Sequence, residues 1–291
     1  VGAGAAGLAC AITAAERGHE VALYESADDI GGQLRLARAV PGKQEFDELL
    51  RYFRRGVERG GVRLVLGTRP RASELAGFDR IVVATGVRAR VPDIAGIDHP
   101  KVVGYADLLS GRKPAGQRVA IIGAGGIGFD VAEFLLHSEG DASDPIARFH
   151  AEWGVDTSAL AVGGLKPEIA PALKREVTLL QRKPGKPGRG LGLSTGWALR
   201  AQLARRGLHT LSGCSYERID ERGLHLRVDG QPRLLEVDTV VVCAGQDSEN
   251  ALAAELRSLG IEPDVIGGAE RANELDALRA IDQGTRLALA I

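Results

Sequence analysis

The stretch Val1-Gly-Ala-Gly-Ala-Ala-Gly7 decides the fold expected of this chain. Its glycines, Gly2, Gly4 and Gly7, follow the spacing Gly-x-Gly-x-x-Gly, with Ala5 and Ala6 inside the turn. Between a strand and a helix, the first glycine permits a tight turn and the second lets backbone N–H groups approach a pyrophosphate. The third allows the helix to pack closely on the strand. The helix N-terminus adds partial positive charge for phosphates. The stretch therefore predicts a dinucleotide-binding unit.

The residues that follow support this interpretation. Residues 7–17 are small and apolar, as in a buried helix, and Gly18 is a helix stop signal. Residues 20–25 predict a strand that ends in Glu25, with Ser26 directly after it. A carboxylate about 20 residues beyond the glycines is typical of the acid that binds the adenosine ribose. An ordinary exposed glutamate is the alternative for Glu25.

A second unit of the same kind begins at residue 118. A predicted strand over residues 118–122 precedes Gly123, Gly125 and Gly128, with Gly126 and Ile127 inside the motif. The matching strand of this unit ends in Gln181-Arg182-Lys183, without an acid at its tip. Two cations there would attract a 2′-phosphate, which predicts NADPH rather than NADH. The alternative is a solvated basic loop, because Lys186 and Arg189 are close in sequence.

Three more turns are candidates for contact with a dinucleotide. Two predicted buried strands end in Ala84-Thr85-Gly86 and in Cys243-Ala244-Gly245, and Gly267-Gly268 precedes the last predicted helix. Glycines at such strand ends let the backbone lie close to a bound dinucleotide. Plain turn geometry is the alternative for each of them.

The order of elements predicts an α/β fold with two Rossmann-like domains, one inserted in the other. Strands alternate with helices, which favours parallel sheets covered by helices. Residues 1–112 and 250–291 are expected to form an FAD-binding domain and residues 113–249 an NADPH-binding domain. Residues 87–117 are expected to be a crossing between the domains and residues 137–174 an insertion. Residues 43–59 predict an amphipathic helix, residues 224–228 part of an antiparallel ribbon, and residues 274–289 a final helix.

Composition narrows the possible partners. The formal net charge of -1 indicates neither nucleic acid nor an anionic membrane as a partner. The three cysteines are scattered, and with no Cys-x-x-Cys pair they predict no dithiol relay; a reducing cytoplasm fits. Cys10 and Cys243 are expected to be core thiols, and Trp153 and Trp197 packing residues. A metal site from His137, Asp144 and His150 is not favoured.

The start of the chain indicates a longer polypeptide. The chain contains no methionine and reaches Gly2 at once, where a first strand should be ending. Strands are usually about five residues long. We therefore expect this chain to be a fragment.

Several segments together resemble the bacterial 2,4-dienoyl-CoA reductases, across essentially all 291 residues. The segments that carry the resemblance are Val1-Gly-Ala-Gly-Ala-Ala-Gly-Leu-Ala-Cys-Ala-Ile12, Gly31-Gly-Gln-Leu34, Pro41-Gly-Lys-Gln-Glu-Phe46, Gly123-Ala-Gly-Gly-Ile-Gly-Phe-Asp130, Gln181-Arg-Lys-Pro184, Gly190-Leu-Gly192, Thr195-Gly-Trp197, Leu275-Asp-Ala277 and Gln283-Gly-Thr-Arg286. One departure is Ala5, where that family usually has proline.

The resemblance implies a cofactor set and a missing partner. That family is similar to trimethylamine dehydrogenase and the enoate reductases, in which an N-terminal barrel carries FMN and a [4Fe-4S] cluster. This chain resembles only the C-terminal portion, which carries FAD and NADPH. The resemblance adds Gly32, Gln33 and Leu34 to the expected FAD contacts. The barrel, with FMN and the cluster, is then expected as a covalent N-terminal partner.

The expected function is transfer of hydride from NADPH to FAD, as the electron input of a larger enzyme of unsaturated fatty acid oxidation. No residue of the chain is predicted as a catalytic acid or base. Two alternatives remain open. One is an NADH-using relative, such as an enoate reductase or a disulfide-type reductase. The other is a nucleotide-bound structural domain without redox activity, which holds ADP where FAD is expected.

Overall fold

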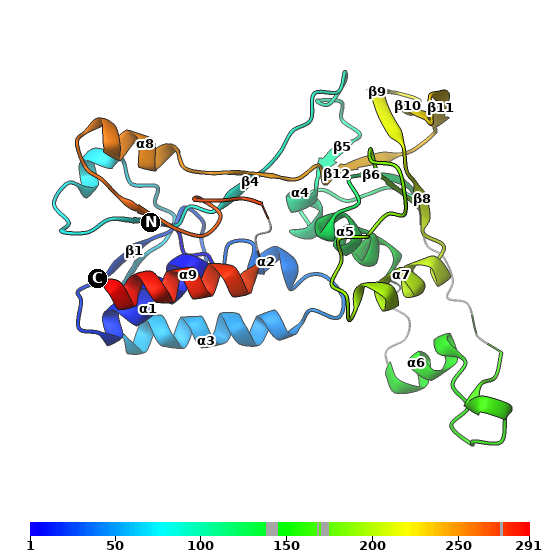
Figure 1. Ribbon diagram of the computed structural model, residues 1–291, viewed down its shortest axis with the longest axis horizontal. Helices are drawn as coiled ribbons and strands as arrows, with labels where there is room; N and C mark the ends of the chain where they lie inside the picture. The colour runs from blue at the N-terminus through cyan, green and yellow to red at the C-terminus, as the bar shows by residue number, and fades with distance from the viewer. Residues whose placement is uncertain (138–144, 168, 170–174, 274–275) are drawn as a thin grey trace. The chain divides into compact units, whose positions relative to one another are not determined.

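The chain forms two compact units. The computed structural model describes residues 1–137, 145–167, 169, 175–273 and 276–291. Unit 1 consists of Val1–Arg90 and Gly245–Ile291, and unit 2 of Val91–Ala244 (Figure 1). Each contains parallel strands and helices, so the predicted α/β class is confirmed.

Unit 1 has short parallel strands and three long helices. Its elements in chain order are α1 (Ala5–Glu16), β1 (Ala22–Tyr24), α2 (Leu34–Ala37), α3 (Glu45–Arg59), β2 (Arg63–Val65), the 3-10 turn η1 (Ala72–Leu75), β3 (Val82–Val83), β4 (Val87–Ala89), β13 (Gln246–Ser248), α8 (Ala251–Ser258), β14 (Asp264–Val265) and α9 (Ala277–Ala290).

The first residues of the chain join the strands of unit 1. Strand β1 pairs with β2, and β3 with β14, all in parallel. Between the two pairs, the Val1 nitrogen donates to Val82 O at 2.7 Å, and Val1 O accepts from Ala84 N at 2.8 Å. Gly2 N donates to Tyr24 O at 2.8 Å. Residues 1–2 thus lie between β1 and β3, where the predicted first strand ends.

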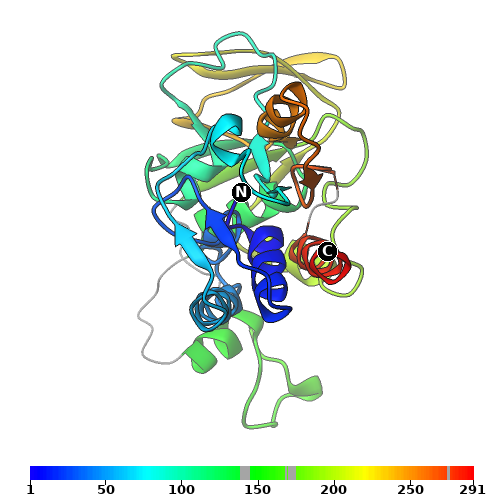
Figure 2. The ribbon, with the colours of Figure 1, turned by 90° about the vertical axis from the view of Figure 1, so that its left-hand side faces the viewer.

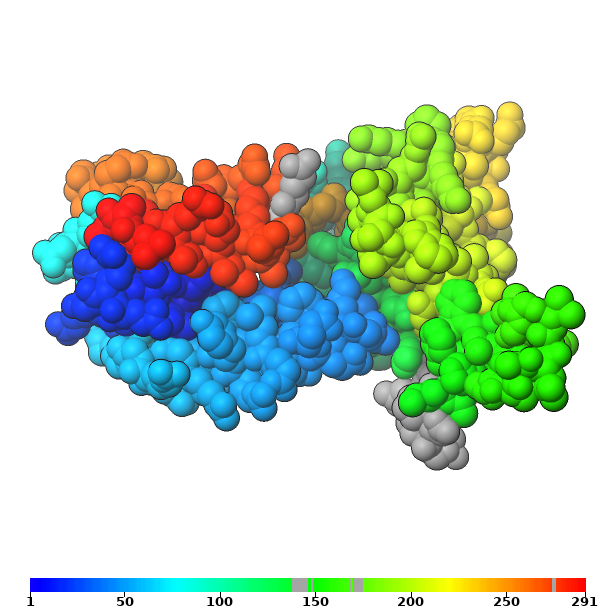
Figure 3. Space-filling view, turned by 60° about the horizontal axis from the view of Figure 1, so that its bottom comes forward, coloured from blue at the N-terminus to red at the C-terminus, as the bar shows by residue number. Residues whose placement is uncertain are grey.

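Helix α1 lies between α9 and α3, as the two ribbon views and the space-filling view show (Figures 1, 2 and 3). Its residues are almost all small and apolar, so both sides of the helix are buried. A Cβ on Gly284 of α9 would come within 2.2 Å of Ala6 O, which shows how closely α9 approaches α1. Cys10 is 5% exposed, so its predicted role as a core thiol is confirmed.

Unit 2 is built around a five-stranded parallel sheet. Its elements in chain order are β5 (Val102–Gly104), α4 (Tyr105–Leu109), β6 (Arg118–Ile122), α5 (Gly126–Leu136), α6 (Pro145–Trp153), the 3-10 turn η2 (Val162–Gly164), β7 (Glu176–Leu180), α7 (Gly196–Arg205), β8 (His209–Leu211), β9 (Cys214–Asp220), β10 (Gly223–Val228), β11 (Gln231–Leu235) and β12 (Thr239–Val242).

The sheet of unit 2 has the order β5-β12-β6-β7-β8 and is covered on both faces. One face packs against the antiparallel sheet β11-β10-β9 through a core that includes Ile122, Leu180 and Leu226. Side chains alternate along strands, so Leu179 points the other way, toward Gly128 of α5. The antiparallel ribbon predicted near residues 224–228 is present as β9 to β11.

The units divide at Arg90/Val91 and Ala244/Gly245, whereas the sequence predicted boundaries at 112/113 and 249/250. Strand pairing explains the difference. Strand β4 pairs with β13, which places residues 245–248 in unit 1. Strand β5 pairs with β12, which places residues 102–104 in unit 2. The sequence suggested only a crossing there.

The segment that contains α6 is joined to the rest of unit 2 by a buried ion-pair network. Arg206, after α7, donates to Glu133 of α5 at 2.7 Å and to Glu152 of α6 at 2.8 Å. All three side chains are at most 10% exposed. Burial is the main influence on Glu133 and raises its pKa, against the opposing effect of Arg206. Arg206 is therefore the cation that compensates the burial of both acidic side chains. None of the described helices is long and apolar enough to cross a membrane.

We predict that Arg206→Gln lowers the free energy of unfolding by about 3–5 kcal/mol at pH 7, because two buried carboxylates lose their cation. Without Arg206, the pKa of Glu133 in the folded protein lies further above its unfolded value. The folded state then binds protons more tightly, so the destabilisation should shrink as the pH falls from 7 toward 5. Urea unfolding at several pH values measures this.

The control is Arg222→Gln, which breaks an exposed ion pair with Glu236 and should cost less than about 1 kcal/mol. If Arg206→Gln proves as mild as this control at every pH, the network does not stabilise unit 2.

Candidate functional site

The two glycine turns have the same geometry, although they lie in different units. Gly2 has a φ of +101° and Gly123 a φ of +114°, which side chains rarely adopt. A Cβ on Gly2 would lie 2.3 Å from Ala84 O, and a Cβ on Gly123 would lie 2.2 Å from Cys243 O. Both turns therefore require glycine at the first position of the motif.

The third glycines bring each helix against its own turn. A Cβ on Gly7 would lie 1.9 Å from Gly2 O, and one on Gly128 would lie 1.9 Å from Gly123 O. No side chain fits in either place. The helices α1 and α5 consequently start directly at the ends of the preceding strands.

The middle glycines, in contrast, face open space. Gly4 and Gly125 are the N-cap residues of α1 and α5, with φ of -80° and -85°, which other residues also adopt. A Cβ on either would meet nothing within 4 Å. Neither helix has a side-chain N-cap or an acidic residue in its first turn. The N–H groups that start these helices are thus free to bind an anion, as a pyrophosphate cradle requires.

We call residues 2–7 the first cradle and residues 123–128 the second cradle, and the remaining motif residues lie within them. Ala5 and Ala6 are the first residues of α1, and Gly126 and Ile127 are the first residues of α5. Ala5 fits the helix start without a proline. The open space at Gly4 and at Gly125 fits the phosphates of one dinucleotide in each unit.

Glu25 is buried beside the first glycine turn, not exposed. It is 9% exposed. One carboxylate oxygen accepts from Ala3 N at 2.7 Å, and the other from Ala27 N at 2.8 Å and from the Ser26 hydroxyl at 3.1 Å. The carboxylate is therefore held next to Gly2 and Gly4, and the alternative of an ordinary exposed glutamate is wrong.

Gln181 occupies in unit 2 the place that Glu25 has in unit 1. Glu25 N donates to Val65 O at 2.9 Å, and Gln181 N donates to Leu211 O at 2.8 Å. The turns repeat the match, because Gly2 N donates to Tyr24 O and Gly123 N to Leu180 O. The Gln181 amide donates to Lys183 O at 2.8 Å and to Gly185 O at 3.3 Å. An uncharged side chain thus replaces the carboxylate and orders the loop that follows.

Arg182 and Lys183 are both exposed at this strand tip. The backbone of Lys183 is held in place, because its carbonyl also accepts from Gly213 N at 3.3 Å. Neither cation forms a salt bridge with a carboxylate in the described part of the chain. The pair adds positive charge directly after the position that matches Glu25 of unit 1.

Two further segments of unit 1 lie against its glycine turn. Gly31 N donates to Ala3 O at 2.7 Å, and a Cβ on Gly32 would lie 3.3 Å from the Cα of Gly4. Gln33 and Leu34 follow, and Gln33 accepts from the amide of Gln246 at 3.3 Å. The structure therefore brings the 31–34 loop next to the first cradle.

The last predicted turn also reaches this cradle. A Cβ on Gly267 would lie 2.8 Å from the Cβ of Ala6, and Gly268 beside it is buried. Gly267 N donates to the side-chain oxygen of Gln283 at 2.7 Å. Gln283 is a positioning residue whose part in this turn the sequence did not reveal, because the contact joins α9 to a distant loop.

The strand ends at residues 84–86 and 243–245 lead into the crossings between the units. Gly86 has a φ of +77°, and its carbonyl accepts from Glu249 N at 2.9 Å. The Thr85 hydroxyl donates to Glu249 O. Gly245, which follows Ala244, has a φ of +100°, and its carbonyl accepts from Arg90 N at 3.0 Å. Both turns thus hold the β4–β13 connection.

All three cysteines are buried free thiols. Burial raises the pKa of Cys10 to about 11 and also raises the pKa values of the Cys214 and Cys243 thiols. The predicted core role of Cys10 and Cys243 is confirmed. Such thiols are poor nucleophiles at neutral pH.

Two other expectations concern tryptophans and metals. The expectation that Trp197 is a packing residue is wrong, because it is 63% exposed on the short helix α7. Trp153 is half-buried and packs under the guanidinium of Arg205, as expected. Among the described residues, no group of three His, Cys, Asp or Glu side chains is arranged to hold a metal ion. Asp144 and the start of the predicted last helix, residues 274–275, lie outside the described residues.

Comparison with known proteins identifies the family. Residues 1–275 match the family described as pyridine nucleotide-disulphide oxidoreductase. The chain belongs to this family. It is an NAD(P)H-dependent flavin oxidoreductase module with the fold of that family.

Individual relatives are longer than this chain. It is 33% identical to a metal reductase of Desulforamulus reducens over 92% of this chain and 40% of that protein. It is 26% identical to an NADH oxidase of Thermoanaerobacter brockii over 100% of this chain and 40% of that protein. A solved complex of 2-naphthoyl-CoA reductase with 2-naphthoyl-CoA has a TM-score of 0.81 and 26% identity, over 100% of this chain and 39% of that one. The chain thus spans about 40% of the length of the metal reductase and of the NADH oxidase.

The two glycine environments of unit 2 predict opposite effects for one added methyl group. Gly125→Ala adds it in open space, so the melting temperature should stay within about 2 °C while affinity for a nicotinamide dinucleotide falls about tenfold or more. Gly128→Ala adds it 1.9 Å from Gly123 O, so the same measurement should show a loss of stability.

Thermal unfolding and titration with dinucleotide separate the two effects. Equal losses of stability in both variants would show that Gly125 serves the fold and not a ligand.

Proposed function

We propose that this chain is the electron-input part of a larger flavoprotein similar to 2,4-dienoyl-CoA reductase, with FAD in unit 1 and NADPH in unit 2. One observation carries the proposal: the glycine cradle occurs twice with the same geometry, but the strand tips beside the cradles differ in charge. Glu25 is an acceptor for ribose hydroxyls, whereas Arg182 and Lys183 attract a 2′-phosphate.

In unit 1, the FAD pyrophosphate would lie at the start of α1. The carboxylate of Glu25, already oriented by Ala3 N and Ala27 N, would accept the ribose hydroxyls. The residues proposed to contact FAD are Gly2, Gly4, Ala5, Ala6, Gly7, Glu25, Ser26, Gly32, Gln33, Leu34, Ala84, Thr85, Gly86, Gly267 and Gly268.

In unit 2, the NADPH pyrophosphate would lie at the start of α5. Gln181 leaves out the negative charge that would repel a 2′-phosphate, and Arg182 and Lys183 are exposed beside it. The residues of unit 2 proposed to contact NADPH are Gly123, Gly125, Gly126, Ile127, Gly128, Arg182, Lys183 and Ala244. Gly245, which follows Ala244 and begins the second segment of unit 1, is also a proposed dinucleotide contact.

When both are bound, the nicotinamide supplies a hydride that the flavin accepts. The chain's own residues orient the two dinucleotides and anchor their phosphates, while the cofactors carry out the chemistry. We assign no catalytic acid or base.

The electrons then have to leave the module for an acceptor that these residues do not provide. The three cysteines are buried singly and free, so they offer neither a dithiol nor a cluster site. We propose that the acceptor is an N-terminal barrel with FMN and a [4Fe-4S] cluster, in a cytoplasmic enzyme that reduces unsaturated acyl-CoA. The greater length of the relatives supports this proposal.

The visible spectrum of the purified chain, recorded anaerobically before and after NADPH, tests the function. We expect flavin absorption bands that bleach with NADPH and much more slowly with NADH. A colourless protein that contains only an adenine nucleotide would contradict the redox function and favour a nucleotide-bound structural domain. Equal bleaching by both dinucleotides would contradict the preference for NADPH.

The double variant Arg182→Gln, Lys183→Gln should lose most of that preference. Charge-assisted hydrogen bonds are worth about 1.5–3 kcal/mol, so the KM for NADPH should rise roughly 10- to 150-fold with little change for NADH. Steady-state kinetics with an artificial acceptor measures both. The matched control is Lys113→Gln, which also removes an exposed cation. Lys113 precedes β6, whereas the second glycine turn follows β6. If the ratio of the KM for NADH to the KM for NADPH is unchanged in the double variant, Arg182 and Lys183 do not determine the preference for NADPH.

A further inference from the structure

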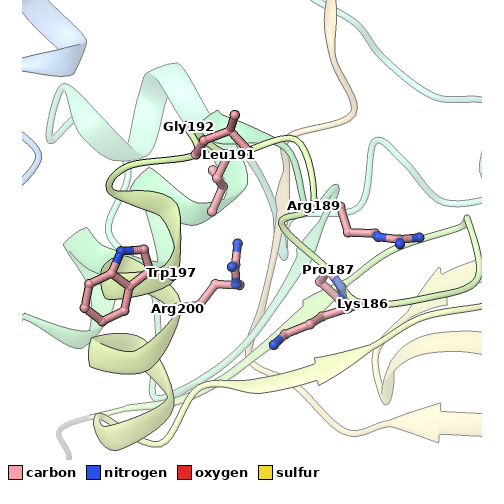
Figure 4. A pocket seen from close by; sticks show the side chains of 8 residues that line it. Lys186, Pro187, Arg189, Leu191, Gly192, Trp197 and Arg200 are labelled. Atoms are coloured by element: carbon pink, nitrogen blue, oxygen red, sulfur yellow. The ribbon is translucent and has the colours of Figure 1, made fainter.

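A cation-lined cavity of about 570 Å³ lies in unit 2, between the 186–193 loop and α7 (Figure 4). The figure shows Arg200 reaching from α7 into the same space that Lys186 approaches from the loop, while Trp197 projects from α7. The residues that line the cavity are Lys186, Pro187, Arg189, Leu191, Gly192, Leu193, Trp197 and Arg200.

The charge of this cavity is uncompensated. It has three cations and no carboxylate in its lining. None of the three forms a salt bridge with a described residue, whereas Arg118 and Arg227 of the same unit are both paired with carboxylates. Like charges that share a site repel one another. An anionic ligand would remove this repulsion.

The loop that lines one side of the cavity follows the tip of β7 in the chain. The Gln181 amide holds Gly185 O, and Arg189 Nη1 lies 3.9 Å from the position that a Cβ on Gly185 would take. Further along the loop, Arg200 Nη1 donates to Gly188 O at 2.9 Å. Arg182, Lys183, Lys186 and Arg189 thus belong to one loop after β7, and Arg200 of α7 holds the backbone of the same loop.

The cavity also has an apolar side. Trp197 is 63% exposed and Leu193 is 99% exposed, although both are residue types that usually gain from burial. A cavity lined by an indole ring and by cations suits a ligand that combines a planar base with a phosphate.

We propose that this cavity receives the adenine and 2′-phosphate end of NADPH, with Lys186, Arg189 and Arg200 as specificity-determining cations in addition to Arg182 and Lys183. The inference rests on the proposed use of NADPH by unit 2. From the sequence alone, a solvated basic loop was the alternative explanation for the cations near Lys186 and Arg189. Under this proposal the same loop is part of the NADPH site. The preference for the phosphorylated dinucleotide is then distributed over two segments, the strand tip and the 186–200 loop and helix.

Adenosine 2′,5′-bisphosphate and 5′-AMP are suitable probes, because they report this end of the dinucleotide without flavin or turnover. We expect the full chain to bind the bisphosphate more tightly than 5′-AMP, with quenching of Trp197 fluorescence. The double variant Lys186→Gln, Arg189→Gln should bind the bisphosphate about tenfold or more weakly and 5′-AMP as before. Trp197→Phe should lose the quenching but keep most of the affinity.

The variants Lys113→Gln and Arg182→Gln, Lys183→Gln complete the test, with the melting temperature as a check that each variant folds. Lys113→Gln should change nothing. If the Lys186/Arg189 variant binds the bisphosphate like the unaltered chain while the Arg182/Lys183 variant does not, the inference is wrong and the proposed function stands. If the unaltered chain does not prefer the bisphosphate over 5′-AMP, the preference for NADPH itself is contradicted.

Discussion

The close approach of each helix to its own glycine turn is the constraint on which both candidate sites depend. Gly7 and Gly128 each stand where a Cβ would lie 1.9 Å from the carbonyl of the first glycine in the motif. This approach starts α1 and α5 directly at a strand end, so that their first N–H groups have no side-chain cap. A helix that started one residue later, or that carried a side chain at Gly7, could not present those groups to a phosphate in the same way.

The two units apply this constraint with opposite electrostatics. In unit 1 the buried carboxylate of Glu25 receives N–H groups from Ala3 and Ala27, so a negative charge stands beside the cradle. In unit 2 Gln181 takes the same place and uses its amide on the loop that carries Arg182 and Lys183. A single difference in residue type, acid against amide, thus removes the negative charge from the strand tip of unit 2. The family match includes residues of both units, whereas the difference between Glu25 and Gln181 concerns a single position in each unit.

Other features of the chain are structural. The network of Arg206 with Glu133 and Glu152 joins α5, α6 and α7, and it holds the inserted segment to unit 2 through charges that are hardly exposed. The buried thiols behave as small apolar side chains, although the family takes its name from a disulfide. The chain therefore has both glycine turns of the family fold, while its three cysteines are single buried thiols.

The sequence by itself determined the glycine turns, the strands before them, Glu25 and the basic strand tip. These features depend on backbone conformation and spacing over a few neighbouring residues. Only the tertiary structure decided the unit boundaries, because these follow from the pairing of β4 with β13 and of β5 with β12. It also decided the contact of Gln283 with Gly267 and the exposure of Trp197. Each of these results from contacts between segments far apart in the chain, and neither residue type nor local spacing specifies such contacts.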